Sequence, residues 1–347
     1  MPRLLRSSSI FVGRRRVVTL AGDQRLFSRL LCYMDGSTAK RRAVRAGAKF
    51  LVASRMLQFV ARRSSTEESN EIRELSEHLR DVAASLGNET AAVAVMWPIS
   101  DRAHRRYITG LDSSGANPLF CKFSTKPELD ADLFENEHAM LKTLHDRGIK
   151  GWRTPRSCGL RQSGGSISLV MEGLPGQRRH LTWDDILARL PLEQVELAES
   201  RSLRRANELD WYRAAELTPA SAAFNRAAVR AALTPVSVSL VNGDVTPCNS
   251  VCAGTERWLY DWEFAHDAGP HQTDVVAVIL NRSAMGKPGG ARLIMVVREE
   301  ALRRGITEVD LVMSLLYLST LQHSGAMRVM AEWAEPNDAD EDGGDNA

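Results

Sequence analysis

Several features are scarce in this sequence, and each absence excludes a class of protein. The 347 residues include five cysteines, and none belongs to the paired CxxC arrangement of a zinc site. Arg, Asp or Gly breaks every hydrophobic run before it reaches the roughly 18 apolar residues of a membrane-spanning helix. A composition of 44% hydrophobic and 25% charged residues excludes disorder of the whole chain. We therefore expect a cytoplasmic protein without membrane insertion.

Positive charge is concentrated at the N-terminus, although the net charge is only +2. Residues 1–63 contain 15 Lys and Arg against two Asp. A solvated helical extension is the favoured interpretation of this segment, so nucleic acid is not expected as a partner. A patch for nucleic acid or an anionic surface, and an organelle transit peptide in the first 22 residues, are the alternatives.

The hydrophobic periodicity changes along the chain. Apolar residues at near-helical spacing predict amphipathic helices over 24–63 and 66–86, so residues 1–88 are expected to form a basic helical extension. Short alternating segments bounded by turn residues then predict an antiparallel sheet. One strong helix is expected at 130–146. The expected strands are 91–97, 105–111, 118–123, 155–160, 166–172, 236–241 and 257–261.

This order of segments predicts an α+β protein of two lobes. A small antiparallel-sheet lobe with one main helix is expected over 89–173, and a larger, mostly helical lobe over 174–334. Residues 335–347 combine Pro, Gly and Asn with six acids and lack apolar periodicity. Such a segment cannot offset its ordering entropy by burial, so a disordered acidic tail is expected there.

The most informative segment is 237–263, SVSLVNGDVTPCNSVCAGTERWLYDWE. Asp244 and Asn249 are five residues apart in a polar loop, and Asp261 follows at the end of a strand. Phosphoryl transfer needs one carboxylate to accept the proton of the attacking hydroxyl, and further oxygens to hold magnesium against the nucleotide phosphates. Turn chemistry between two strands would use the same residue types, so each piece alone also fits a plain hairpin.

The pieces together, NGDVTPCN…LYDWEFA, resemble the HGDxxPxN…DWE signature of the aminoglycoside phosphotransferase and choline kinase families. The resemblance covers about residues 90–325 and implies a protein-kinase-like two-lobed fold. It implies Asp244 as the catalytic base, with Asn249 and Asp261 as ligands of Mg²⁺. It also implies that Asp274, in GPHQTDVV, braces the catalytic loop from a neighbouring helix.

A kinase also needs a lysine on a strand of the small lobe and a glutamate that positions it. Alternation in PLFCKFS places Lys122 among aromatic neighbours. Glu137 lies in the apolar stripe of the following helix, and an acid on a buried side needs a cation. Glu135, about 200° round the helix from Glu137, is the competing partner. The plainer alternative is a Lys122 that extends to water and a Glu137 at the edge of the stripe.

The segment SLVMEGLPGQ resembles the family's hinge, where backbone groups bind a purine. The resemblance implies that Met171, Glu172 and Gly173 contact the nucleotide, either ATP or GTP. The sequence departs from the family at Asn242, which stands in place of His, and at Cys248, which stands in place of an aromatic residue. No glycine-rich phosphate loop appears between residues 97 and 118.

The preferred hypothesis is an enzyme that transfers the γ-phosphate of ATP or GTP to a hydroxyl of a small molecule such as an aminoglycoside, an amino alcohol or a sugar. Asp184, Asp185 or Glu263 would serve an acidic acceptor pocket, or they are ordinary helix-start acids and solvated charges. The alternative function is a pseudokinase that acts as a binding module, with its basic N-terminal segment docked on nucleic acid or an anionic surface. No oligomeric state is predicted.

Overall fold

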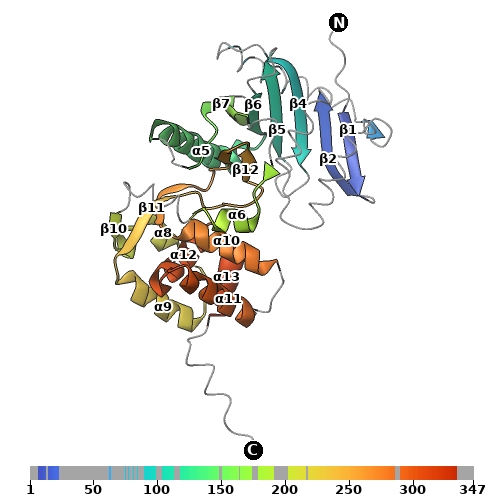
Figure 1. Cartoon of the computed structure of the whole chain (residues 1–347). Helices are drawn as coiled ribbons and strands as arrows, with labels where there is room; N and C mark the ends of the chain where they lie inside the picture. Colours follow the sequence, from blue (N-terminus) through green and yellow to red (C-terminus); the bar gives the residue numbers. More distant parts are fainter. Residues whose placement is uncertain are drawn as a thin grey trace, which may run out of the picture. The chain divides into compact units, whose positions relative to one another are not determined.

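The computed structural model describes residues in two compact units (Figure 1). The first unit comprises Met1–Gly148, Trp152–His180 and Pro247–Glu263, and the second comprises Ile149–Gly151, Leu181–Thr246 and Phe264–Ala347. Within these ranges the described residues are 7–12, 15–22, 62–63, 75, 77, 81, 84, 90–98, 104–112, 118–147, 151–163, 165–173, 179–190, 202–215, 218–285 and 290–333.

The first unit is built on an antiparallel sheet with the strand order β3-β1-β2-β4-β5-β6-β8-β7. Hairpin neighbours pair in sequence from β4 to β6, and β8 inserts between β6 and β7. The strands are β1 (Ser7–Val12), β2 (Arg15–Gly22), β3 (Arg62–Arg63), β4 (Thr90–Pro98), β5 (Arg105–Asp112), β6 (Pro118–Ser124), β7 (Ser157–Ser163) and β8 (Ser166–Glu172).

One long helix, α5 (Pro127–Arg147), covers this sheet and contacts β7 and β8 (Figure 1). Acids in its first turn suit the positive end of the helix dipole. Its buried side carries Phe134, Leu141 and Leu144 together with two acids, Asp130 and Glu137. A small second sheet in the same unit has the order β13-β12-β9, formed by β13 (Glu256–Leu259), β12 (Ser250–Ala253) and β9 (Arg179–His180).

The second unit is mainly helical and surrounds α12 (Glu308–Thr320). Nine consecutive residues of α12, from Leu311 to Ser319, are buried, as expected of a helix that is apolar on all sides. A three-stranded sheet completes this unit, with the order β10 (Ser202–Arg204), β11 (Val236–Val241), β14 (His266–Pro270). The other helices among the described residues of this unit are α6 (Trp183–Leu187), η4 (Ala206–Glu208), α8 (Asp210–Ala215), α9 (Ala222–Ala232), α10 (Thr273–Ala284), α11 (Gly290–Arg303) and α13 (Ser324–Ala331).

These elements confirm the predicted α+β class, with an antiparallel-sheet unit that carries one main helix and a mostly helical unit. The domain boundaries of the prediction stay a prediction. No helix among the described residues is long and apolar enough to cross a membrane. The acidic tail expected over 335–347 lies outside the described residues.

The prediction of a helical extension over residues 1–88 needs a partial correction. Ser7–Val12 and Arg15–Gly22 are strands that extend the sheet; β2 contains the β-branched run VVT, which favours extended backbone, and it pairs with β1 and β4. Four described residues of the expected 66–86 helix are helical: Leu75, Glu77, Asp81 and Ala84. The amphipathic helices expected over 24–63 lie outside the described residues, except that Arg62–Arg63 is a short strand.

Candidate active site

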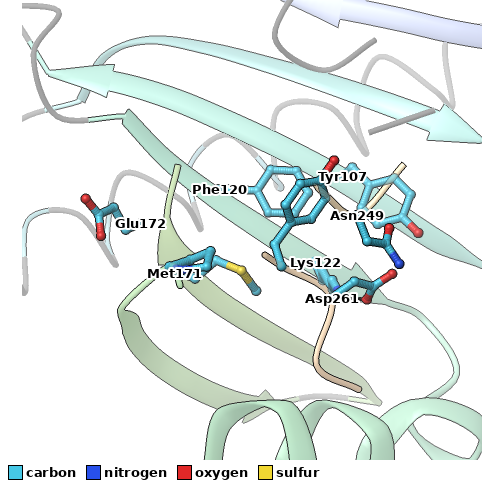
Figure 2. A pocket seen from close by; sticks show the side chains of 9 residues that line it. Tyr107, Phe120, Lys122, Met171, Glu172, Asn249 and Asp261 are labelled. Carbon is cyan, nitrogen blue, oxygen red and sulfur yellow. Dashed lines mark hydrogen bonds and ion pairs between the residues drawn. The ribbon is translucent and has the colours of Figure 1, made fainter. Parts of the chain in front are cut away.

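A pocket in the first unit is lined by side chains from strands of the large sheet and from the polar loop and hairpin around Asn249 and Asp261 (Figure 2). Lys122 of β6, Asn249 before β12 and Asp261 after β13 all line it, although 139 residues separate Lys122 from Asp261. With Met171 and Glu172, five of the residues singled out in the sequence therefore meet at one place. The full lining consists of Tyr107, Phe120, Lys122, Pro155, Met171, Glu172, Asn249, Tyr260 and Asp261.

Alternation along β6 gives Lys122 its direction. Leu119 and Cys121 belong to a buried apolar cluster on one face of the sheet, whereas Phe120 and Lys122 line the pocket on the other. The rings of Tyr107 and Phe120 are stacked beside the lysine, with centroids 5.9 Å apart (Figure 2). The side chain of Lys122 is only 7% exposed, so its ammonium depends on protein partners.

The partners of Lys122 are carboxylates. Its Nζ donates to Glu137 Oε2 at 2.7 Å and also contacts Asp261 Oδ1. Glu137 is fully buried, while Glu135, the competing candidate, is exposed. The second oxygen of Glu137 accepts the backbone N–H of Trp262 at 3.1 Å. Glu137 therefore holds both the lysine and the backbone next to Asp261.

The electrostatics of this cluster show an excess of negative charge. Burial would lower the pKa of Lys122, but Asp261, Glu137 and Glu263 raise it well above its ordinary value. Burial raises the pKa of Glu137 to about 7; the Lys122 ammonium opposes this rise, and the charges of Asp261 and Glu263 add to it. Burial and the neighbouring carboxylates thus both act against the charged form of Glu137, and the Lys122 ammonium acts in its favour.

Asp261 has a backbone conformation that few residue types adopt. Its φ is +66°, in the left-handed region, where Asp and Asn are tolerated better than other non-glycine residues. Backbone strain of this kind is concentrated at functional sites. The turn sends the Asp261 carboxylate to Lys122 immediately after β13 ends at Leu259.

Asn249 is held by a residue that the sequence argument did not single out, Tyr260. Asn249 is 7% exposed, and its carbonyl accepts the N–H of Tyr260 at 3.0 Å. The Tyr260 hydroxyl also donates to the carbonyl of Cys248. Both bonds tie the loop to the strand that leads into Asp261. The signal for Tyr260 was its position next to Asp261, which is not specific.

The hinge residues lie at the end of β8. Met171 and Glu172 line the pocket, whereas Gly173 is buried and is not among the lining residues. The N–H of Glu172 donates to the carbonyl of Arg156 at 2.8 Å, so this donor is already engaged. Nucleotide contacts of these three residues stay a prediction.

The residues of the polar loop before Pro247, Asp244 among them, belong to the second unit. The buried carboxylate of Asp274 accepts the N–H groups of Asn242 and Gly243, each at 2.9 Å, and the Asn242 side chain accepts the N–H of Asp244 at 3.0 Å. Burial raises the pKa of Asp274 to about 6, although the two backbone hydrogen bonds oppose the rise. Asp244 is thus carried on a loop that Asp274 and Asn242 hold from two sides.

The three acids considered for an acceptor pocket have other partners. Glu263 is buried and accepts from Arg105 Nη1 at 2.8 Å. Asp185 forms a capping box with Thr182, and Asp184 pairs with Arg282 at 2.9 Å on the surface. Asp184 and Asp185 are ordinary helix-start acids, whereas Glu263 is one of the three acids, with Glu137 and Asp261, that surround Lys122.

No protein-family model and no curated protein sequence matches the chain. Solved structures with similar folds include a thermostable mutant of the aminoglycoside phosphotransferase APH(4)-Ia, in ternary complex with AMP-PNP and hygromycin B. That match has 10% identity and a TM-score of 0.43, and covers 72% of this chain and 96% of the other.

Two further similar structures are an aminoglycoside-3'-phosphotransferase of type VIII and a glucosamine kinase. The first has 20% identity and a TM-score of 0.33, and covers 62% of this chain and 88% of the other. The second has 14% identity and a TM-score of 0.28, with coverages of 69% and 83%. At these values the matches assign neither an activity nor a substrate to this chain.

The residues of the pocket fit a magnesium ion by their own chemistry. Asn249 and Asp261 offer hard oxygen ligands, which Mg²⁺ prefers. Carboxylate oxygens of Glu137, Asp261 and Glu263 all lie within 4.8 Å of one another. Burial is the main cause of the raised pKa of Glu137, and a divalent cation would compensate the charges of Asp261 and Glu263 that add to this rise.

Gly243, next to Asp244, is expected to tolerate no side chain. Its φ is +82°, and an added Cβ would lie 2.9 Å from the Phe264 carbonyl oxygen and 2.9 Å from Leu321 Cδ1. Gly243→Ala should lower the free energy of unfolding by roughly 1–2 kcal/mol for the left-handed backbone and by about 1–3 kcal/mol more for the contacts. Urea denaturation measures the loss.

Gly305→Ala is the matched control because Gly305 has a φ of +73° in the same unit with open space around its Cβ position. It should show the backbone cost without the contact cost. Equal losses in the two variants would contradict the packing that the structure gives to the loop before Asp244.

Proposed function

We propose that this protein is a nucleotide-dependent phosphotransferase that moves the γ-phosphate of ATP or GTP onto a hydroxyl of a small molecule. Aminoglycosides, amino alcohols and sugars are the proposed acceptor classes. The observation that carries the proposal is the convergence of Lys122, Asn249 and Asp261 on one pocket, with Glu137 buried behind the lysine. A loop that only connects two strands would not need a buried lysine that pairs with two acids, as Lys122 pairs with Glu137 and Asp261.

The proposed roles follow from the chemistry of each group. Lys122 binds the nucleotide phosphates, and Glu137 fixes its ammonium so that little reorganisation is needed when the phosphates arrive. Asn249 and Asp261 hold Mg²⁺, which would neutralise charge on the phosphates. Met171, Glu172 and Gly173 are the proposed contacts of the base.

Asp244 is the proposed base. Its carboxylate orients the acceptor hydroxyl and accepts its proton as the acceptor oxygen bonds to the γ-phosphorus. The bond between that phosphorus and the β–γ bridging oxygen breaks, and the nucleoside diphosphate leaves with the bonding electrons. Positioning and charge neutralisation supply most of the catalysis in this scheme.

Magnesium-dependent stabilisation by nucleotide tests the proposal. ATP or GTP at about 100 times its dissociation constant, with Mg²⁺, should stabilise the native state by about 2.7 kcal/mol, seen as a rise in Tm. Asp261→Asn should abolish this rise because it removes the proposed metal carboxylate. Asn is chosen because it also tolerates the φ of +66°.

Asp132→Asn, at an exposed position of α5 in the same unit, is the control and should keep the full Tm shift. Loss of the shift in Asp261→Asn alone supports the proposal. If neither ATP nor GTP raises the Tm of the wild-type protein, with or without Mg²⁺, the proposed function is wrong. Binding without transfer to any hydroxyl compound would select the pseudokinase alternative.

A further inference from the structure

Arg105 is the largest fully buried side chain of the described residues, and the proposed roles do not include it. It begins β5 and is 1% exposed. Its Nε and Nη2 donate to Asp130 Oδ1 at 2.8 and 2.5 Å, and its Nη1 donates to Glu263 Oε2 at 2.8 Å. The guanidinium also lies 5.3 Å from the centroid of the Phe134 ring. Such a buried charge needs a reason because its desolvation is costly.

Glu263 lies between two cations. The same oxygen, Oε2, that accepts from Arg105 at 2.8 Å is 3.8 Å from Lys122 Nζ. The side chains of Glu263 and Lys122 are both buried, so the Coulomb attraction between them is weakly screened. Glu263 therefore competes with Glu137 and Asp261 for the lysine, and the shorter contact to Arg105 limits that competition.

Arg105 also connects the three parts of the unit that must be aligned at the pocket. Through Glu263 it reaches the segment that begins with Asp261, and through Asp130 it reaches the first turn of α5. The same segment is fixed to α5 by two further bonds: Asn136 Nδ2 donates to the Glu263 carbonyl at 3.1 Å, and Trp262 N–H donates to Glu137. A shift of Glu263 would therefore move the neighbours of Lys122.

We propose that Arg105 is a positioning residue of the phosphate site: by binding Glu263 it keeps that carboxylate from drawing the Lys122 ammonium away from the position where the nucleotide phosphates bind. The inference rests on the proposed function. It assigns to the Arg105–Glu263 pair a role in the affinity for the Mg²⁺–nucleotide complex, beyond the stability of the sheet.

The test compares Arg105→Met with Arg105→Met/Glu263→Gln. The dissociation constant of a fluorescent ATP or GTP analogue with Mg²⁺ is measured, and urea denaturation gives the folded fraction of each variant. Arg105→Met should weaken binding by about 10–100-fold, the usual effect of losing a supporting partner behind a ligand-binding group. Adding Glu263→Gln should restore most of that affinity because the competing carboxylate is gone.

A purely structural role predicts a different pattern. It would lower the stability of Arg105→Met without weakening binding by the folded protein, or the double variant would bind no better than the single one. Either result overturns the inference. If Arg105→Met does not fold, Arg105→Lys keeps a charge without the fork of donors, and should show a smaller loss that Glu263→Gln again restores.

Arg153→Met is the matched control, because Arg153 forms an exposed ion pair with Glu256 in the same unit. It should bind nucleotide like the wild type. The proposed function and this inference fail separately: a wild-type protein that binds no nucleotide overturns both, whereas normal binding by Arg105→Met overturns the inference alone.

Discussion

Asp244→Asn should lower the rate of phosphoryl transfer by roughly 10²–10⁴-fold, the usual contribution of a general base, while the Mg²⁺–nucleotide complex still binds. The amide keeps the size of the carboxylate but cannot take the hydroxyl proton. Three hydrogen bonds of the loop do not involve the Asp244 carboxylate and should survive the change: the N–H of Asp244 donates to the Asn242 side chain, and the N–H groups of Asn242 and Gly243 donate to Asp274.

Single-turnover transfer of radiolabelled γ-phosphate to aminoglycosides, amino alcohols and sugars measures this effect. Asp210→Asn, at an exposed site in the first turn of α8 in the same unit, is the control and should transfer at the wild-type rate. Transfer by Asp244→Asn at the wild-type rate would remove Asp244 from the mechanism. An equal loss of nucleotide affinity would instead make it a binding residue.

The strands from β4 to β8, the helix α5 and, in the second unit, the strand β11 were predictable because their patterns are local, whereas β1 and β2 were expected to be helical. Alternation in PLFCKFS gave both the strand β6 and the direction of Lys122, and the apolar stripe of α5 placed Glu137 on the buried side. The observed bounds of β4, β5, β7, β8 and β11 differ from the expected ones by at most three residues. In each case the side chains themselves carry the periodicity.

Three short strands, β14, β10 and β9, were not predictable in this way. His266–Pro270 has no apolar alternation and contains Gly and Pro, yet it forms β14 because β11 supplies a pairing partner. Ser202–Arg204 and Arg179–His180 are strands for the same reason. Such strands depend on contacts that are distant in sequence, and local propensity does not report them.

The partner of Glu263 was the largest omission in the site. Arg105 is 158 residues away and lies in a stretch rich in Arg, which indicates a solvated segment. Only the folded chain shows that this one arginine points inward, where Asp130 and Glu263 compensate its charge. A long-range ion pair has no periodic signature, so the sequence left open whether Glu263 is an acid of an acceptor pocket or a solvated charge.

Lys122→Met should destabilise the protein by about 3–5 kcal/mol, the usual cost of removing one partner of a buried ion pair. Glu137 and Glu263 would remain buried without the ammonium that lies 2.7 and 3.8 Å from them. Urea denaturation at neutral pH measures the loss. The pKa of Lys122 lies above its ordinary 10.5, so the lysine's contribution is fully present below that pH and is lost only as the pH rises through the higher folded value.

The double variant Lys122→Met/Glu137→Gln separates the ion pair from simple packing. It removes both charges of the pair with little change in shape, so it should be more stable than Lys122→Met alone. Lys126→Met, at an exposed position just after β6, should leave the stability unchanged within about 0.5 kcal/mol. If the double variant loses as much stability as both single changes added together, the two residues do not interact, and Glu137 is not what holds Lys122 at the pocket.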